Sequence, residues 1–400
     1  MSKQIQDAYI VAAVRTPVGK APRGTFKNVR PDDLLAHAIR EALARVPSLD
    51  KSRVEDVIVG CAMPEAEQGM NVGRIGGLLA GLPDNVPGAT VNRLCSSGLQ
   101  AVAMAADRIR LGEADLIIAG GTESMSQVPM GGNKISINPA IFAEERNVGI
   151  AYGMGITAEK VASKWRVPRE DQDAFALESH TRAVKATDSG EFSTEIAPYK
   201  VTEDLPDIAG GNVLHRLREV AIDEGPRRDT SLEALAKLKP VFAAKGTVTA
   251  GNSSQTSDGA AAVIVVSERI LKEHGLKPMA IFRGYAVAGV PPEVMGIGPV
   301  KAVPKVLQQV GLNVRDIDWI ELNEAFAAQA LAVIRDLELD PAKVNPLGGA
   351  IALGHPLGAT GAIRTATIVH GLRRRKQKYG LVTMCVGVGM GAAGVFESVA

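Results

Sequence analysis

Three kinds of residue are scarce in this chain of 400 residues. It contains 3 cysteines, aromatic residues make up 4% of it, and its charges nearly cancel, with 45 Lys and Arg against 44 Asp and Glu. A small, odd number of cysteines gives no disulfide framework, so we expect a reducing compartment, the cytoplasm. A net charge of +1 gives no reason to expect a basic stripe, and we expect no nucleic-acid partner.

Long hydrophobic runs and metal-ligand patterns are also lacking. No apolar stretch approaches the roughly 20 residues that span a bilayer, so we expect no membrane span. The first residues show no charged segment followed by an apolar one, so no signal peptide is expected. The cysteines form no CxxC pair and no two histidines stand four residues apart, so we expect no metal site.

Glycine, with 42 residues, and apolar residues, with 46%, are by contrast abundant. Short apolar strands alternate with amphipathic helices, which predicts an α/β fold. The expected strands cover 8–14, 54–59, 114–119, 260–266, 317–322 and 379–384. The expected helices cover 32–46, 156–165, 169–186 and 301–310, and two further helices follow Cys95 and His355.

The order of these elements occurs twice along the chain. Asp56 corresponds to Asp318, Cys95 to His355, and Leu116 to Leu381, with separations of 262, 260 and 265 residues. The nearly constant separation predicts two copies of one α/β unit. We expect a first half over 1–121 and 247–270, a second half over 271–400, and between them an inserted loop domain, 122–246, that covers the active site.

Cys95 stands at a predicted helix start. Small polar residues and Gly98 surround it, and an apolar run with helical spacing follows. Free N–H groups and the helix dipole favour an anion at such a place, so the thiol would ionise more easily and act as a nucleophile. A buried structural cysteine is the alternative, and this stretch alone leaves both interpretations open.

Further polar residues lie near the ends of predicted strands, where ligands bind in α/β sheets. His355 is bracketed by Gly354 and Pro356, and a cysteine nucleophile needs such a base. Cys385 is either a second proton-transfer group or a buried structural thiol. The glycine run that begins at Gly387 allows backbone N–H groups to approach a reacting carbonyl. Cys61 and the other histidines are given no role.

Seven motifs resemble those of the thiolase family. They are VNRLCSSGLQA at 91–101, GGTESMS at 120–126, TAGNSSQTSDGAAA at 249–262, VPPEVMGIGP at 290–299, NEAF at 323–326, VNPLGGAIALGHPLGATGA at 344–362 and CVGVGMGAA at 385–393. The resemblance implies a thiolase fold, in which two repeated α/β halves pack as a five-layered αβαβα core with an inserted loop domain.

The resemblance also implies a role for each site residue. Cys95 attacks the 3-keto carbon and becomes acylated, and His355 takes its proton. Asn323 holds a water in the oxyanion hole that His355 helps to form. Cys385 protonates the departing carbanion. The backbone N–H groups of Cys95 and Gly387 form a second oxyanion hole.

The motifs are most similar to those of the degradative 3-ketoacyl-CoA thiolases of fatty-acid β-oxidation. Ser96-Ser97 and the GIGP sequence at 296–299 favour this group over the biosynthetic one, and Gly153 adds room for acyl chains longer than acetoacetyl. The implied ligands are 3-ketoacyl-CoA, acetyl-CoA and CoA, with Ser254 facing the pantetheine and Arg227 and Ser231 near the nucleotide. CoA is a cosubstrate, and no other cofactor is expected.

Two alternatives stay open at this point. One is a biosynthetic acetyl-CoA C-acetyltransferase that makes acetoacetyl-CoA with the same residues. The other is a non-catalytic acyl-CoA-binding scaffold, which would be expected to lack a catalytic residue. The resemblance further implies a homodimer or homotetramer and leaves room for a β-oxidation multienzyme partner.

Overall fold

The computed structural model describes residues 5–208 and 210–399. Residues 1–4 of the expected first half, residue 209 of the expected insertion and residue 400 of the expected second half lie outside the described residues. The strands are β1 (Tyr9–Arg15), β2 (Gly19–Lys20), β3 (Asp56–Gly60), β4 (Gly88–Val91), β5 (Leu116–Ser124), β6 (Tyr199–Asp207), β7 (Asn212–Val220), β8 (Ser257–Val266), β9 (Ala280–Gly289), β10 (Trp319–Leu322), β11 (Tyr379–Val386) and β12 (Met390–Ser398). The α-helices are α1 (Pro31–Ala44), α2 (Val72–Leu79), α3 (Ser97–Arg110), α4 (Met154–Lys164), α5 (Arg169–Asp188), α6 (Leu232–Ala236), α7 (Glu268–His274), α8 (Gly298–Val310), α9 (Ala327–Asp336), α10 (Ala350–Leu353) and α11 (Leu357–Arg375).

The strand order shows the internal repeat. One wing of the main sheet runs β4-β3-β5-β8-β1 and the other β10-β11-β12-β9. In each wing a parallel pair (β3 with β5, β10 with β11) is followed by two antiparallel pairings, and the first wing carries one further parallel strand, β4, beside β3. The wings join where β1 pairs with β9 over two residues of each strand. The predicted repetition of one α/β unit is thus present in the sheet.

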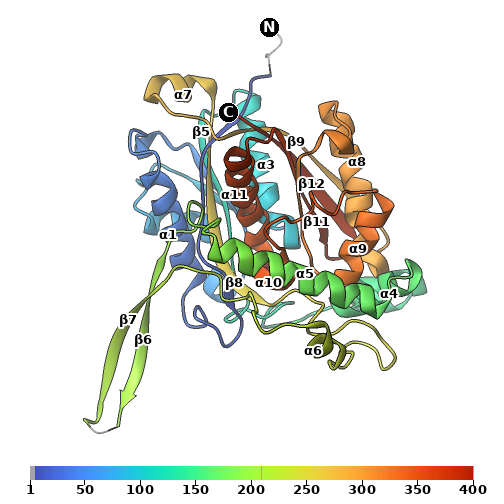
Figure 1. Ribbon diagram of the computed structural model, residues 1–400. Coiled ribbons are helices and arrows are strands. Elements are labelled where there is room, and N and C mark those ends of the chain that lie inside the picture. Colours follow the sequence, from blue (N-terminus) through green and yellow to red (C-terminus); the bar gives the residue numbers. More distant parts are fainter. Residues whose placement is uncertain (1–4, 209, 400) are drawn as a thin grey trace.

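Helices lie on both faces of each wing. Helices α3 and α11 pack against each other and against strands of both wings, so they form the central layer (Figure 1). Helices α1 and α2 cover the outer face of the first wing, and α8 covers that of the second wing with α9 beside it. The five predicted layers are confirmed. The apolar core is divided accordingly, with one buried cluster around the two central helices and others under the outer helices.

Two glycines allow the central helices to touch. A Cβ at Gly361 of α11 would lie 2.1 Å from the backbone nitrogen of Leu99 in α3. A Cβ at Gly98 would lie 2.7 Å from the backbone nitrogen of Ala362. Any side chain at either position would push the helices apart. The close contact brings the N-terminal ends of both helices together, and Cys95 and His355 stand next to these ends.

Two strands are longer than predicted. Strand β5 was expected to stop at 119, but it runs through two glycines to Ser124 because these residues continue to pair with β8. Strand β11 was expected to stop at 384, but Cys385 and Val386 still pair with β12. Cys385 therefore lies within a strand rather than in the loop after it.

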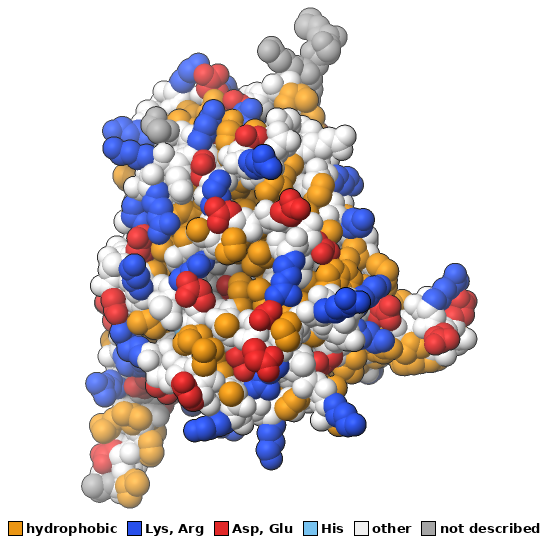
Figure 2. All heavy atoms as spheres, turned by 45° about the vertical axis from the view of Figure 1, so that its right-hand side comes forward, with side chains coloured by type: hydrophobic (Ala, Val, Ile, Leu, Met, Phe, Trp, Pro, Cys, Tyr) orange, Lys and Arg blue, Asp and Glu red, His pale blue; other side chains and the backbone are white. Residues whose placement is uncertain are grey.

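The segment between the two copies packs onto both. Helix α4 contacts α9, and α5 contacts α9 and α10, all in the second copy, while Ile196 after α5 pairs with Arg15 of β1 in the first copy. The β6–β7 hairpin extends away from the body of the molecule (Figure 1). On the face shown in Figure 2, basic and acidic side chains are interspersed rather than gathered in one region of either sign. Among the helices described, none is both long and apolar enough to cross a membrane.

Candidate active site

One cavity of about 290 Å³ collects most of the predicted site residues. Cys95, His355, Cys385 and Gly387 line it, and so does Ser254. They come from the starts of the two central helices, from β11 and the turn that follows it, and from the loop before β8. Residues that are far apart in the sequence thus meet at one place between the two halves.

Cys95 lies in the short 3-10 turn η3 (Leu94–Ser96) that leads into α3. The preceding residue, Leu94, has a φ of +45°, and its N–H donates a hydrogen bond of 2.8 Å to Asn92 Oδ1. A left-handed conformation at a residue with a side chain costs roughly 1–3 kcal/mol. Such strain directly before the reactive residue is typical of functional sites.

The acidity of Cys95 differs from the expectation. Burial raises the pKa of its thiol to about 11, although the backbone N–H groups of Gly387 and of Cys95 itself act in the opposite direction. The helix start alone therefore does not produce a thiolate. Deprotonation needs a base within the cavity, and His355 is the imidazole that lines it.

The hydrogen bonds of His355 fix its tautomer. The Thr360 hydroxyl donates to the Pro356 carbonyl at 2.9 Å, so its oxygen is an acceptor for the Nδ1–H of His355 at 2.6 Å. The lone pair is then on Nε2, which lies 3.3 Å from Asn323 Nδ2. Burial, and next the charge of Arg364, lower the pKa of His355 to about 3. The imidazole is therefore neutral and can accept a proton through Nε2.

Asn323 directly follows β10, and its backbone N–H donates to the Thr383 carbonyl at 2.9 Å. Its side-chain nitrogen faces His355. Its Oδ1 is buried and has no hydrogen-bond partner among the described residues. A buried acceptor of this kind is available to a water or a ligand, which agrees with the water-holding role that the motif predicts.

Cys385 also lines the cavity, from the end of β11. It packs in a buried cluster with Met295, Ala325 and Phe326. Burial, followed by the charge of the nearby Cys95, raises the pKa of its thiol. Cys385 is therefore protonated at rest and can donate a proton.

Two buried carboxylates were missed by the sequence analysis. Glu123 accepts hydrogen bonds from the N–H groups of Ala62 at 2.7 Å and Gly358 at 2.7 Å, and so ties the loop after β3 to the first turn of α11. Burial raises its pKa. The residue stands within the GGTESMS motif, but only the tertiary structure shows that its side chain points between the two halves.

Glu324 is the second missed carboxylate and follows Asn323 directly. It accepts from the Ser179 hydroxyl at 2.6 Å, from Asn345 Nδ2 at 2.8 Å and from the Ile351 N–H at 3.2 Å. It therefore joins the loop that carries Asn323 to α5 and to α10. An acidic residue within an otherwise apolar stretch was the only signal in the sequence.

Comparison with known proteins decides the family. Residues 8–269 match the family described as thiolase, N-terminal domain, and residues 276–398 match thiolase, C-terminal domain. The chain belongs to the thiolase family.

Among curated relatives of this thiolase-family chain, a 3-ketoacyl-CoA thiolase of Bacillus subtilis is 52% identical, with 98% of this chain and 100% of that protein covered. A beta-ketoadipyl-CoA thiolase of Pseudomonas knackmussii is 48% identical with the same coverage. Among solved structures, the human mitochondrial 3-ketoacyl-CoA thiolase has a TM-score of 0.89 at 40% identity, covering 99% of this chain and 100% of that one. The dimeric peroxisomal thiolase of Saccharomyces cerevisiae has a TM-score of 0.87 at 41% identity, covering 98% of each chain.

The residues that the resemblance assigns to CoA, Ser254, Arg227 and Ser231, do not all line the cavity that contains Cys95. Ser254 lines the active cavity, and its N–H donates to the Ala325 carbonyl at 2.9 Å. Arg227 lies outside this cavity and lines a neighbouring hollow of about 340 Å³. Gln255 lines both, so the two spaces adjoin. Ser231 lines neither, and its hydroxyl caps α6 by accepting from the N–H of Ala234.

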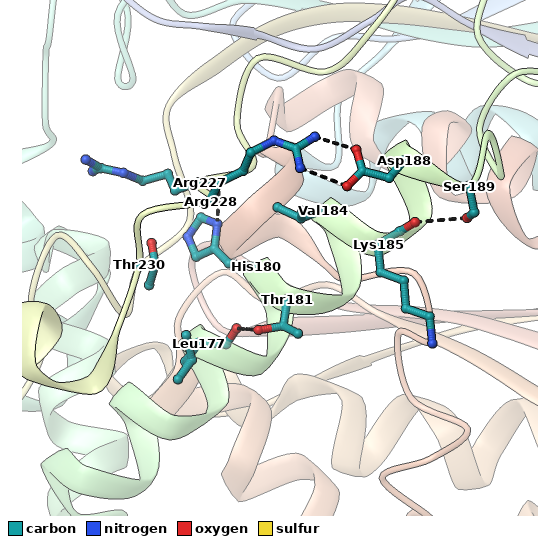
Figure 3. Close-up of a pocket in the computed structure, with 10 residues that line it drawn as sticks. All are labelled: Leu177, His180, Thr181, Val184, Lys185, Asp188, Ser189, Arg227, Arg228 and Thr230. Carbon is teal, nitrogen blue, oxygen red and sulfur yellow. Dashed lines mark hydrogen bonds and ion pairs between the residues drawn. The ribbon is translucent and has the colours of Figure 1, made fainter.

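Arg227 also borders a third hollow, of about 690 Å³, which opens over α5 (Figure 3). The backbone N–H of Arg227 donates to His180 Nδ1 at 3.1 Å. Arg228, next to it, forms an ion pair with Asp188 at the end of α5. These contacts anchor the arginine loop, while the Arg227 side chain is 61% exposed and lies 3.6 Å from the exposed carboxylate of Asp229.

Proposed function

We propose that this chain is a degradative 3-ketoacyl-CoA thiolase, an acyltransferase that cleaves 3-ketoacyl-CoA with CoA into acetyl-CoA and an acyl-CoA two carbons shorter. The observation that carries the proposal is the meeting of two buried thiols, Cys95 and Cys385, with a neutral imidazole, His355, in one cavity. A simple thiol hydrolase needs one sulfur, whereas carbon–carbon cleavage also needs an acid for the carbanion that leaves. The full-length similarity to the Bacillus subtilis 3-ketoacyl-CoA thiolase supports the same activity.

In the first half-reaction, Cys95 Sγ gives its proton to His355 Nε2 and attacks the 3-keto carbon of the substrate. The new oxyanion accepts hydrogen bonds from the backbone N–H groups of Cys95 and Gly387. When this intermediate collapses, the bond between C2 and C3 breaks and its electron pair moves onto C2. Cys385 donates its thiol proton to C2, which releases acetyl-CoA and leaves the acyl group on Cys95.

His355 and Asn323 act on the other carbonyl of the substrate. When the bond between C2 and C3 breaks, negative charge spreads onto the thioester oxygen of the departing acetyl-CoA. The His355 imidazolium and a water held by Asn323 stabilise that oxygen. Asn323 Nδ2 lies 3.3 Å from His355 Nε2, and this supports the joint role because the two side chains are close enough to act on the same oxygen.

In the second half-reaction, free CoA gives its thiol proton to the Cys385 thiolate and attacks the acyl carbonyl on Cys95. The bond between the acyl carbon and Cys95 Sγ breaks, and His355 returns the proton to Cys95. The acyl group passes from one thioester to another and stays activated. The proposed reaction therefore needs no ATP, no metal and no cofactor other than its cosubstrate CoA.

The path of CoA follows from the adjoining hollows. We place the pantetheine beside Ser254 and the nucleotide near Arg227 and Ser231, whose positive charge and hydroxyl suit phosphate groups. The segment 122–246 contributes Met130, Ile150 and other residues to the cavity lining, which supports its proposed covering role. Three free thiols fit a reducing compartment, so we propose the cytoplasm as the location, and a homodimer by analogy with the yeast structure.

The experiment is thiolysis of acetoacetyl-CoA and of 3-oxodecanoyl-CoA by the purified chain, followed by chromatography of the acyl-CoA products. We expect acetyl-CoA together with octanoyl-CoA from the longer substrate. Activity confined to acetoacetyl-CoA would contradict the degradative proposal and favour the biosynthetic alternative. Absence of turnover with both substrates, with binding of both retained, would favour the non-catalytic scaffold.

A further inference from the structure

A buried ion pair joins β10 to α11 next to the contact between Asn323 and His355. Glu321 and Asn323 stand two residues apart at the end of β10, so their side chains point to the same face of the sheet. Arg364 Nη1 lies 3.4 Å from Glu321 Oε2. Arg364 follows Thr360, the acceptor for the Nδ1–H of His355, by four residues, so both side chains lie on one face of α11. The ion pair is therefore the next link between strand and helix after the one that involves His355.

This ion pair lies where charge is costly. The Glu321 side chain is fully buried and the Arg364 side chain is 3% exposed. Their neighbours on the same faces of strand and helix, Trp319 and Ile368, belong to the central apolar cluster. Two charges that are taken out of water regain the lost hydration only if their contact is close and their other donors and acceptors are satisfied.

A second buried arginine, Arg15, shows such a satisfied contact. It donates to both carboxylate oxygens of Asp223, at 2.7 and 2.8 Å, and to Glu195 at 2.7 Å. Arg364 has a single long contact, to Glu321, and its Nε has no partner among the described residues. A buried arginine that is held so loosely needs a reason other than stability.

Arg364 acts on His355 through its charge. After burial, this charge is the further cause that lowers the pKa of His355 to about 3. Four other titratable groups face the region from the elements packed around it, namely Cys95, Cys385, Glu123 and Glu324. Burial raises the pKa of both thiols, which are therefore uncharged at rest, and both carboxyl groups are occupied by N–H and hydroxyl donors. Arg364 is thus the charge that remains free to act on the imidazole.

Glu321 decides how strongly Arg364 acts. As a carboxylate it balances the guanidinium charge, and as a neutral acid it leaves that charge in full. Burial raises the pKa of Glu321 to about 7, while the charge of Arg364 and the hydrogen bond from Trp319 act in the opposite direction. The charges of Glu195 and Glu324 add to the rise. The Glu321 carboxyl group therefore changes its charge close to neutral pH.

We propose that the Arg364–Glu321 pair controls the proton affinity of His355 during turnover. Arg364 keeps the imidazole neutral at rest. The Glu321 carboxylate offsets the charge of Arg364 when the imidazolium forms, and so stabilises the state in which Cys95 is a thiolate. Neither member of the pair lines the cavity, so both are positioning residues that act through His355. The inference rests on the proposed thiolase activity.

The first test compares the unmodified chain with Glu321→Gln in thiolysis of acetoacetyl-CoA from pH 6 to pH 8.5. Gln keeps an acceptor for the Trp319 indole but carries no charge. We expect kcat to be about tenfold lower in the variant at pH 8.5, with little change in KM, because the charge of Arg364 is left unbalanced. The difference should shrink to about twofold near pH 6, where Glu321 of the unmodified chain is itself protonated. A ratio that is constant with pH would overturn the inference, since lost packing does not depend on pH.

The double variant Glu321→Gln with Arg364→Met provides the second test. It removes the unbalanced charge, so kcat at pH 8.5 should be at least about threefold higher than in Glu321→Gln alone. An equal or lower kcat would overturn the inference. The double variant buries no unpaired charge, so it also serves if Glu321→Gln does not fold. It should then lack the fall in kcat toward pH 6 that the unmodified chain shows, and the same fall in both proteins would overturn the inference.

Asp223→Asn is the matched control. It takes one carboxylate from Arg15, which keeps Glu195, and Asp223 does not line the active cavity. We expect kcat to change less than about threefold and to keep the pH dependence of the unmodified chain. A response like that of Glu321→Gln would overturn the inference, because any buried carboxylate would then have the same effect.

The unmodified chain separates the two levels of the proposal. Absence of acetoacetyl-CoA thiolysis at every pH in this range would contradict the proposed function itself. Normal thiolysis with a constant ratio between the unmodified chain and Glu321→Gln would contradict only the role of the ion pair.

Discussion

Asn323 Nδ2 lies 3.3 Å from His355 Nε2, although the two residues belong to different elements of the second half. Asn323 follows the end of β10, and His355 precedes α11. The His355 Nδ1–H is fixed by Thr360, so the Asn323 amide meets the one free lone pair of the imidazole. This pairing defines the orientation of the base before any substrate binds.

The first prediction concerns Asn323. Asn323→Ala removes both the amide next to His355 and the buried acceptor Oδ1. Loss of a single group of an oxyanion hole typically lowers kcat by a factor of about 100 to 1000, and we expect a loss of that order in thiolysis. Steady-state kinetics with 3-oxodecanoyl-CoA measure it, and a less than threefold change in kcat would contradict the role.

The second prediction concerns Thr360, which acts through His355. Thr360→Val keeps the shape of the side chain but removes the acceptor for Nδ1–H, so the imidazole loses its fixed tautomer. We expect kcat to fall about tenfold to a hundredfold while KM changes little. The pH profile of kcat should shift as well, because the basicity of the imidazole depends on this hydrogen bond.

A matched control lies on the same helix. Thr365 is buried, and its hydroxyl donates to the carbonyl of Gly361, four residues before it, as Thr360 does to Pro356. It makes no hydrogen bond to His355. Thr365→Val should therefore retain kcat, and an equal loss in both variants would show that the effect is a general loss of helix hydroxyls.

The third prediction separates the two thiols. Cys95→Ser should abolish formation of the acyl-enzyme, because a serine alkoxide is far harder to form than a thiolate. Cys385→Ser should retain acylation of Cys95 by a simple thioester better than it retains carbon–carbon cleavage. Mass spectrometry of the intact protein after incubation with acetyl-CoA measures acylation, and acetyl-CoA release measures cleavage.

The third cysteine provides the control for these variants. Cys61 is buried but does not line the cavity. Cys61→Ala should retain both acylation and cleavage. An acyl group found on Cys385 would contradict the assignment of Cys95 as the nucleophile, and equal loss of both reactions in Cys385→Ser would assign Cys385 a structural role.

The fourth prediction concerns stability at low pH. Burial, and next the charge of Arg227, lower the pKa of His180 to about 4 from an unfolded value near 6.5. The unfolded chain then binds the proton first as the pH falls, so the stability is complete above about pH 6.5 and is lost toward pH 4. The free energy of unfolding should fall by at most about 1.4 kcal/mol per pH unit from this residue.

His180→Asn tests this linkage. The amide oxygen of Asn can replace Nδ1 as acceptor for the Arg227 N–H but does not titrate. Urea unfolding between pH 4 and pH 7 should give a shallower pH slope in this variant. An unchanged slope in His180→Asn would contradict the prediction.

Much of the fold followed from local pattern. Apolar strands such as β8 and the helix that begins after Cys95 were predictable because the spacing of apolar residues within a few positions determines them. The recurrence of these elements at a nearly constant separation along the chain predicted the two halves. Boundaries were missed at Gly120 and Cys385. At both places the hydrogen-bonded pairing continues beyond the apolar run, through two glycines in β5 and through Cys385 and Val386 in β11, and only the partner strand reveals this.

The chemistry of the site was less accessible from sequence. Burial raises the pKa of the Cys95 thiol although its position at a helix start suggested the opposite, because desolvation depends on side chains from both halves. Glu123 and Glu324 were overlooked for the same reason. Their hydrogen-bond partners lie far away in the chain, so their function as ties between loops exists only in the folded protein.

The contact between α3 and α11 through Gly98 and Gly361 sets the spacing of the catalytic groups independently of the segment that lines the cavity entrance. Cys95 and His355 stand at the starts of these two helices, and the helices are held at a fixed distance because only glycine fits where they touch in the core. The rim of the cavity is contributed largely by the segment 122–246, which packs on the outside of that core. The range of accepted acyl chains can therefore diverge by changes in that segment while the distance between nucleophile and base stays constant.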